Sequence, residues 1–232
     1  MASGSKHLLF RSSGCGSISV EVLLKMLQVE YDVVDINYKE LKGNVENESI
    51  KRLAQHNPLK QIPTFITKEG AVLTESAAIL LHLTEAHRRE TEKLGLRPFI
   101  DQDPKRAAEF TRWMFFAATN IYAVMVMNDT PKRWVADDSS EEAVDAFQTK
   151  VDDRMYFALR ILNDGVQGPY ILGDRLTILD VYVAMICCWI RNGSKERFSE
   201  ELPKLLDVIA KVEENPIVRE VWLENEFVPI KN

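Results

Sequence analysis

The chain has 232 residues, of which 46% are hydrophobic and 28% charged, and its formal net charge is -6. This composition is typical of a globular protein and not of a disordered one. The acidic balance, with no block rich in Lys or Arg, argues against a nucleic-acid partner. No apolar run is long enough for a membrane span or a secretory leader, so we expect a cytoplasmic protein with no membrane partner.

The three cysteines are Cys15, Cys187 and Cys188. Adjacent cysteines rarely bridge each other and an odd number leaves one over, so the pattern indicates a reducing compartment and not a disulfide framework. Cys187 and Cys188 fall in the apolar run 181–190, where free cysteines are usually core residues. Because no two histidines stand at metal-ligand spacing, we expect no metal site.

The first 86 residues alternate between patterns typical of strands and of amphipathic helices. The expected strands cover 6–10, 31–36, 62–66 and 71–73, and the expected helices cover 19–27, 47–55 and a segment that begins at 75–76. In chain order they form a parallel βαβ unit, a further helix, an antiparallel hairpin and a last helix. This order predicts a thioredoxin-like α/β domain over residues 1–86.

The rest of the chain is predicted to be helical. Residues 87–103 are polar and contain glycine and proline, which is typical of a linker, and residues 104–232 show helical periodicity almost throughout. Thr177 and Asp180 have the spacing of a capping box, and the apolar segment 181–190 behind them predicts a central buried helix. The fold class is therefore α/β followed by an all-α domain.

Two short motifs in the first domain point to chemistry. Pro63, after Gln61 and Ile62, begins a strand, where proline cannot donate to the ladder. Either the strand simply begins at a sheet edge, or the Ile62–Pro63 bond is cis and the backbone of Ile62 is offered to a bound peptide. Twelve residues on, Ser76 stands at a helix N-terminus, which favours a carboxylate, and Glu75 would pair with an ammonium group.

Together these motifs describe a groove for a peptide backbone beside a pocket for a free α-amino acid end. The segments 57–65 (NPLKQIPTF), 73–79 (LTESAAI) and 172–180 (LGDRLTILD) resemble, in this order, signatures of the glutathione transferase superfamily. The resemblance covers nearly the whole chain. It implies a thioredoxin-like domain followed by a helical one, usually in a homodimer, with glutathione as co-substrate and no metal.

The resemblance also implies residue roles. Ile62, next to Gln61 and Pro63, would hold the cysteinyl part of glutathione, and Glu75 and Ser76 the γ-glutamyl part. A basic residue near positions 42 or 60 would meet the glycyl carboxylate.

The group that activates the thiol is expected in the loop after the first strand. This loop contains no tyrosine, and its candidates are Ser17, Cys15 and Ser13. A serine would stabilise the thiolate by a hydrogen bond at the helix N-terminus. A cysteine there could form a mixed disulfide with glutathione, but residue 18 is not a second cysteine, which excludes a dithiol cycle.

The second substrate is expected against the helical domain. Trp113, Phe116 and Asn120 lie along one long predicted helix and are candidates for a hydrophobic pocket. An aromatic stripe at this spacing is more often part of a core or a dimer interface, and that alternative stays open.

Three functions fit the sequence. The first is conjugation of the glutathione thiolate to a small hydrophobic electrophile, as in detoxification. The second is a thiol transferase, reductase or lyase built on Cys15. The third is a non-catalytic binding module with the same fold, because a fold does not fix a function.

Overall fold

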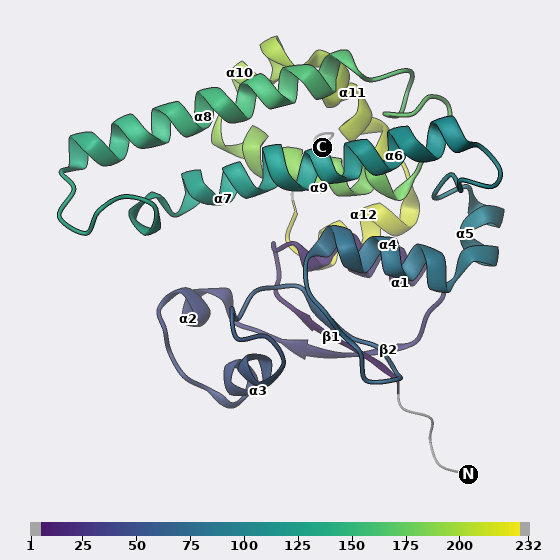
Figure 1. Cartoon of the computed structure of the whole chain (residues 1–232), viewed down its shortest axis with the longest axis horizontal. Helices are drawn as coiled ribbons and strands as arrows, with labels where there is room; N and C mark the ends of the chain where they lie inside the picture. Colours follow the sequence, from purple (N-terminus) through teal and green to yellow (C-terminus); the bar gives the residue numbers. More distant parts are fainter. Residues whose placement is uncertain (1–5, 228–232) are drawn as a thin grey trace. The chain divides into compact units, whose positions relative to one another are not determined.

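The computed structural model describes residues 6–227, except for the side chains of residues 191 and 192, and divides them into two compact units (Figure 1). Unit 1 comprises residues 6–97 and 213–227, and unit 2 comprises residues 98–212. The C-terminal helix α12 (Pro216–Glu224) falls in unit 1 because it packs against α1 (Ser17–Met26). The sequence pattern had placed it with the other helices in residues 104–232.

Unit 1 is built on a four-stranded sheet with the order β2-β1-β3-β4. Its strands are β1 (His7–Arg11), β2 (Tyr31–Asp35), β3 (Thr64–Ile66) and β4 (Val72–Leu73). β1 and β2 are parallel and joined by α1, whereas the pairs β1–β3 and β3–β4 are antiparallel. The predicted thioredoxin-like order is confirmed.

The helices of unit 1 cover both faces of this sheet. Besides α1 and α12 they are α2 (Tyr38–Lys42), α3 (Glu48–His56), α4 (Ser76–Ala86) and α5 (Arg88–Leu94). α1 and α4 lie together on one side of the strands, and α2 and α3 on the other (Figure 1). α2 was not predicted, and α5 occupies much of the segment expected to be a linker.

A buried cluster joins the sheet to α3. It contains Phe10, Ile36, Ile50 and Leu53, and the partly buried side chain of Ile62 packs against it. Since successive side chains of a strand point to opposite faces, Arg11 faces the other side, toward α1.

Unit 2 is helical in the part of the chain that the structure describes. Its elements are α6 (Pro104–Phe116), a π-helical turn η1 (Ala117–Tyr122), α7 (Ala123–Asp129), a 3₁₀ turn η2 (Pro131–Arg133), α8 (Glu141–Asp164), α9 (Ile178–Gly193), α10 (Lys195–Glu201) and α11 (Pro203–Val212). The predicted burial of segment 181–190 is confirmed, and Cys187 and Cys188 are buried in it. Within residues 6–227, no helix is both long and apolar enough to cross a membrane.

Candidate functional site

Three segments of unit 1 lie at the same end of the sheet, where β1 and β4 end and β3 begins. The antiparallel register pairs Phe10 with Thr64, and Phe65 with Leu73. β1 and β4 both end where β3 begins, so the loop after β1, the segment before Thr64 and the start of α4 lie at the same end of the sheet.

Ile62 presents its backbone at this end of the sheet. The peptide bond between Ile62 and Pro63 is cis, the second of the two alternatives left open by the sequence. Neither the N–H nor the C=O of Ile62 has a hydrogen-bonding partner among residues 6–227. Buried or half-buried backbone groups are nearly always paired, so a strand-like donor and acceptor left open here suit an extended peptide ligand.

Asn57 holds the Ile62 segment in place. Its buried side-chain amide donates to the carbonyl of Gln61 (3.2 Å) and to Thr64 Oγ1 (3.0 Å), and its Oδ1 accepts from the amide of Leu59 (3.1 Å). This role of Asn57 was not predicted from the sequence. The signal that could have found this role is an asparagine before proline, whose side chain can bond backbone groups further along a turn.

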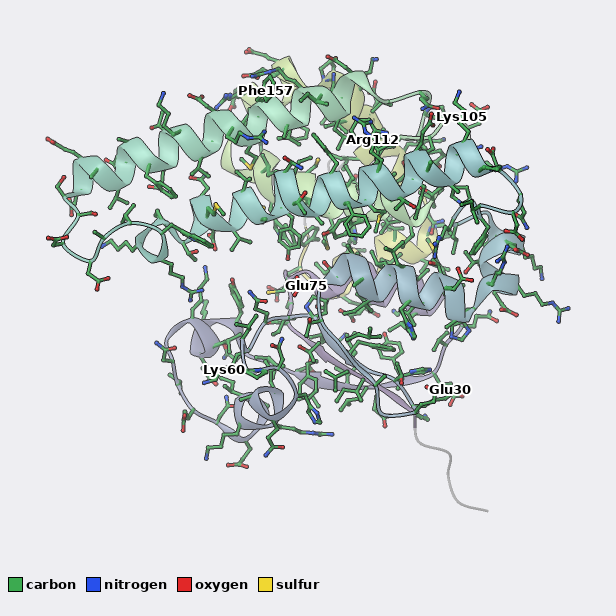
Figure 2. The ribbon with its side chains drawn as sticks, viewed as in Figure 1. Glu30, Lys60, Glu75, Lys105, Arg112 and Phe157 are labelled. Atoms are coloured by element: carbon green, nitrogen blue, oxygen red, sulfur yellow. The ribbon has the colours of Figure 1, made fainter. Side chains whose placement is uncertain are left out.

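The start of α4 is uncapped. Glu75, at the N-cap position, forms no capping hydrogen bond and has a φ of 62°, a left-handed conformation unusual for a residue other than glycine. The first amides of the helix have no acceptor within residues 6–227, and neither does the hydroxyl of Ser76, although Ser76 is only 5% exposed. Figure 2 shows Glu75 at this helix end and Lys60 in the loop after α3.

These groups match the α-end of an amino acid. Free amides and a serine hydroxyl at a helix N-terminus bind a carboxylate, and the exposed carboxylate of Glu75 can meet an ammonium group. The side chain of Gln61 is exposed beside them.

The loop after β1 is fixed at both ends by two buried serines. Ser12 Oγ donates to the carbonyl of Ile36 (2.6 Å). Ser17 Oγ donates to the carbonyl of Ser12 (3.2 Å) and accepts from the amide of Ser12 (3.4 Å). The hydroxyl of Ser17 is thus fully buried and engaged in closing the loop.

Ser13 and Cys15, the other two candidates for the activating group, lie at the tip of this loop. Ser13 is exposed, and Cys15 is half-buried and not in a disulfide. The amide of Cys15 donates to the carbonyl of Ser12 (3.2 Å), and its carbonyl accepts from the amide of Ile18 (3.2 Å), so the turn leads directly into α1. Gly14, between them, has a φ of 72°, which favours glycine.

The pocket candidates of unit 2 differ in their surroundings. Trp113 is 4% exposed, and its ring leaves no space for a Cβ at Gly165, at the end of α8, where that atom would lie 2.4 Å from Trp113 Cζ2. Phe116 is half-buried with its ring edge-on to Trp113 (5.3 Å). Asn120, in the π-helical turn, accepts a hydrogen bond from Arg154 of α8 (2.9 Å). Trp113 is thus a core residue, whereas the other two keep partly accessible atoms.

No cluster of three or more His, Cys, Asp or Glu side chains within the described residues could hold a metal ion. The site in unit 1 is instead made of backbone amides, one carbonyl, hydroxyls and a carboxylate.

Comparison with known proteins identifies the family. Residues 9–85 match the glutathione S-transferase N-terminal domain, and residues 125–226 match the glutathione S-transferase C-terminal domain. Glutathione S-transferase stcT of Emericella nidulans is 30% identical to this chain, over 72% of the chain and 71% of its own length. The chain belongs to the glutathione S-transferase family.

Two other members of the family show how far the likeness extends. The uncharacterized GST-like protein YncG of Escherichia coli is 26% identical over 93% of this chain and 96% of its own length. A crystal structure of a glutathione transferase homolog from Sulfitobacter, with bound glutathione, superposes with a TM-score of 0.79 at 18% identity, over 97% of this chain and 100% of that one. This superposition establishes the glutathione S-transferase fold for 97% of the chain.

Proposed function

We propose that this protein is a glutathione transferase that binds glutathione at this end of the sheet in unit 1 and adds its thiolate to a small hydrophobic electrophile. The proposal rests on two sets of polar groups there that have no hydrogen-bonding partner. The backbone of Ile62 has no partner among residues 6–227, and next to it α4 begins without a cap at Ser76. A family member of the same fold is described with bound glutathione, which supports this choice of ligand.

The tripeptide fits these features part by part. Its cysteinyl residue pairs with the N–H and C=O of Ile62 as an added strand would. The γ-glutamyl carboxylate meets the first amides of α4 and the hydroxyl of Ser76, and the γ-glutamyl ammonium meets Glu75. Gln61 and Pro63 border the same groove, and Lys60 is the nearest basic side chain in the chain order for the glycyl carboxylate.

The thiol of a ligand bound in this way faces the loop after β1. A thiol has an ordinary pKa of about 8.5, and lowering it by about 2 units requires roughly 2.7 kcal/mol. One charge-assisted hydrogen bond contributes about 1.5–3 kcal/mol, and the N-terminus of α1 adds to it. Because the hydroxyl of Ser17 already closes the loop, we assign this hydrogen bond to Ser13 or Cys15.

A second candidate function is thiol transfer by Cys15, which the half-buried, disulfide-free state of this residue favours. Its thiolate would attack the disulfide of a glutathionylated substrate and release the substrate thiol. A second glutathione would then attack the mixed disulfide on Cys15, which restores the thiolate and yields glutathione disulfide.

Ultraviolet difference spectra of reduced glutathione with the wild type and with Ser13→Ala, Cys15→Ala and Ser17→Ala would test both functions. We expect a thiolate band in the wild type and in Ser17→Ala, and its loss in Ser13→Ala or Cys15→Ala, together with conjugation of chlorodinitrobenzene. Binding without a thiolate band, with disulfide reduction that Cys15→Ala abolishes, would favour the second function. No binding at millimolar glutathione would favour a non-catalytic module. Homodimerisation is part of the proposal and can be checked by light scattering.

A further inference from the structure

Glu21 is a buried acidic residue that the proposed site does not use. It lies on α1, one turn after Ser17, and its side chain is 1% exposed. A buried carboxylate is costly unless it is paired and hydrogen-bonded. Its Oε2 accepts a hydrogen bond from Arg11 Nη1 at 2.5 Å, so the pair persists inside the fold for a reason other than surface solubility.

Arg11 lies where the loop 12–17 leaves the sheet. It is the last residue of β1, and its carbonyl accepts from the amide of Ile36 (2.8 Å) while its Nε donates to Asp35 (2.8 Å). The next residue, Ser12, donates to the carbonyl of Ile36. Arg11 therefore ties the first end of the loop 12–17 to the end of β2.

Glu21 connects this point to the other end of the loop. Ser17 is the first residue of α1, and Glu21 follows it on the same helix face. The Arg11–Glu21 ion pair thus bridges the two anchors of the loop that carries Ser13 and Cys15.

The other charged and polar groups around Glu21 come from α12 and from β2. Asn225 and Glu224 lie near it at the end of α12, and Tyr31 faces it from β2. Lys25 of α1 is paired with Glu220 and Glu224 of α12, at 2.9 and 2.8 Å. Burial raises the pKa of Glu21, and Arg11 opposes this rise most strongly. The Lys25 ion pairs tie α1 to α12.

We propose that Glu21 is a positioning residue of the glutathione site, which acts through Arg11 to set the place of the loop 12–17 and of the group that stabilises the thiolate. The inference rests on the proposed function. Glu21 does not touch glutathione in this scheme. The binding groups Ile62 and Ser76 lie on other segments, so a change at Glu21 alters turnover and leaves glutathione affinity nearly unchanged.

The test compares Glu21→Met, which keeps the size and removes the pairing, with Glu21→Gln, which keeps an oxygen for Arg11. Glu92→Met is the matched control, because it makes the same substitution in another Arg–Glu pair of unit 1, between Glu92 and Arg88 (2.7 Å), which the argument for the loop does not use. With reduced glutathione and chlorodinitrobenzene, we expect Glu21→Met to lower kcat about tenfold or more, since small displacements of reacting groups have effects of this size or larger. The KM for glutathione should stay within about twofold. Glu21→Gln should recover most of the loss, and Glu92→Met should match the wild type.

Three results would overturn the inference. The first is a folded Glu21→Met variant with wild-type kcat. The second is a Glu21→Met variant whose KM for glutathione changes as much as its kcat, because Glu21 would then be a binding group. The third applies if Glu21→Met does not fold: Arg11→Lys then carries the test, and unchanged thiolate absorbance and kcat in that variant would overturn the inference. Failure of the wild type to bind glutathione would instead overturn the proposed function, and this inference with it.

Discussion

The helices α4 and α9 differ in whether the polar groups at their N-termini have hydrogen-bonding partners. At α9, Asp180 accepts from the amide of Thr177, its hydroxyl and the amide of Ile171, each at 2.7 Å. At α4, Glu75 takes a left-handed conformation and caps nothing, and Ser76 has no partner among residues 6–227. The polar groups at the start of α9 bond one another within the chain and are structural, whereas the open groups at the start of α4 are suited to a ligand.

The largest expected effect breaks the capped start. Asp180→Ala would leave three buried donors without an acceptor, each worth about 1–3 kcal/mol, so we expect the free energy of unfolding to fall by about 3–5 kcal/mol. Urea denaturation measures this loss. Glutathione affinity of the fraction that remains folded should not change, and a specific loss of affinity would contradict the division between the two helix starts.

The second prediction concerns Asn57, which holds the Ile62 segment in place. Asn57→Ala removes the acceptor of the Leu59 amide and the donor to Gln61 and Thr64, so we expect a loss of about 2 kcal/mol in stability. Because the Ile62 segment is then less well fixed, glutathione affinity should fall about tenfold in calorimetry. Ser140→Ala, which removes the cap of α8, is the control and should lower stability alone.

A smaller effect of opposite sign sharpens the comparison. Glu75→Gly places at the left-handed position the residue that adopts it most easily, so we expect stability to rise by up to about 1 kcal/mol while glutathione binding weakens. Thermal unfolding with and without glutathione would show both changes. A Glu75→Gly variant that is less stable and binds normally would show that this conformation serves the fold and not the ligand.

The smallest effect concerns pH in the same unit. His7 stacks on Phe65, and its Nδ1 accepts from the amide of Lys68 (3.2 Å). Burial lowers the pKa of His7, an effect that Glu69 opposes, so the folded protein binds this proton less tightly than the unfolded chain. The corresponding stability is present above pH 6.5, the ordinary value, and is lost as the pH falls through the lowered pKa.

This loss should be absent in His7→Phe, because that variant has no imidazole to protonate. Chemical denaturation of both proteins at several pH values below neutrality measures it. Equal pH profiles for the two proteins would assign the acid sensitivity to another group.

The sequence was sufficient to predict the order of strands and helices in unit 1 and the two segments of interest, because both depend on local patterns, but it left open whether the Ile62–Pro63 bond is cis. Pro63 before a strand and Ser76 at a helix start are such patterns. The role of Ser17 was not predictable in the same way. Its hydroxyl bonds the backbone of Ser12, five positions earlier, and the sequence of a loop does not tell which of its serines closes the loop and which stays open. Likewise, α12 was grouped with the helical domain because periodicity does not tell which neighbour a helix packs against.

The most direct test of the glutathione site is a calorimetric titration of reduced glutathione into the wild type, Ser76→Ala and the control Ser140→Ala. If the uncapped start of α4 binds the γ-glutamyl carboxylate, Ser76→Ala should lose about tenfold or more in affinity, since one hydrogen bond to a charged group contributes about 1.5–3 kcal/mol. Its unfolding temperature should not fall, because this hydroxyl bonds nothing in the described chain. Equal affinity in all three proteins, or no binding by the wild type, would contradict the account.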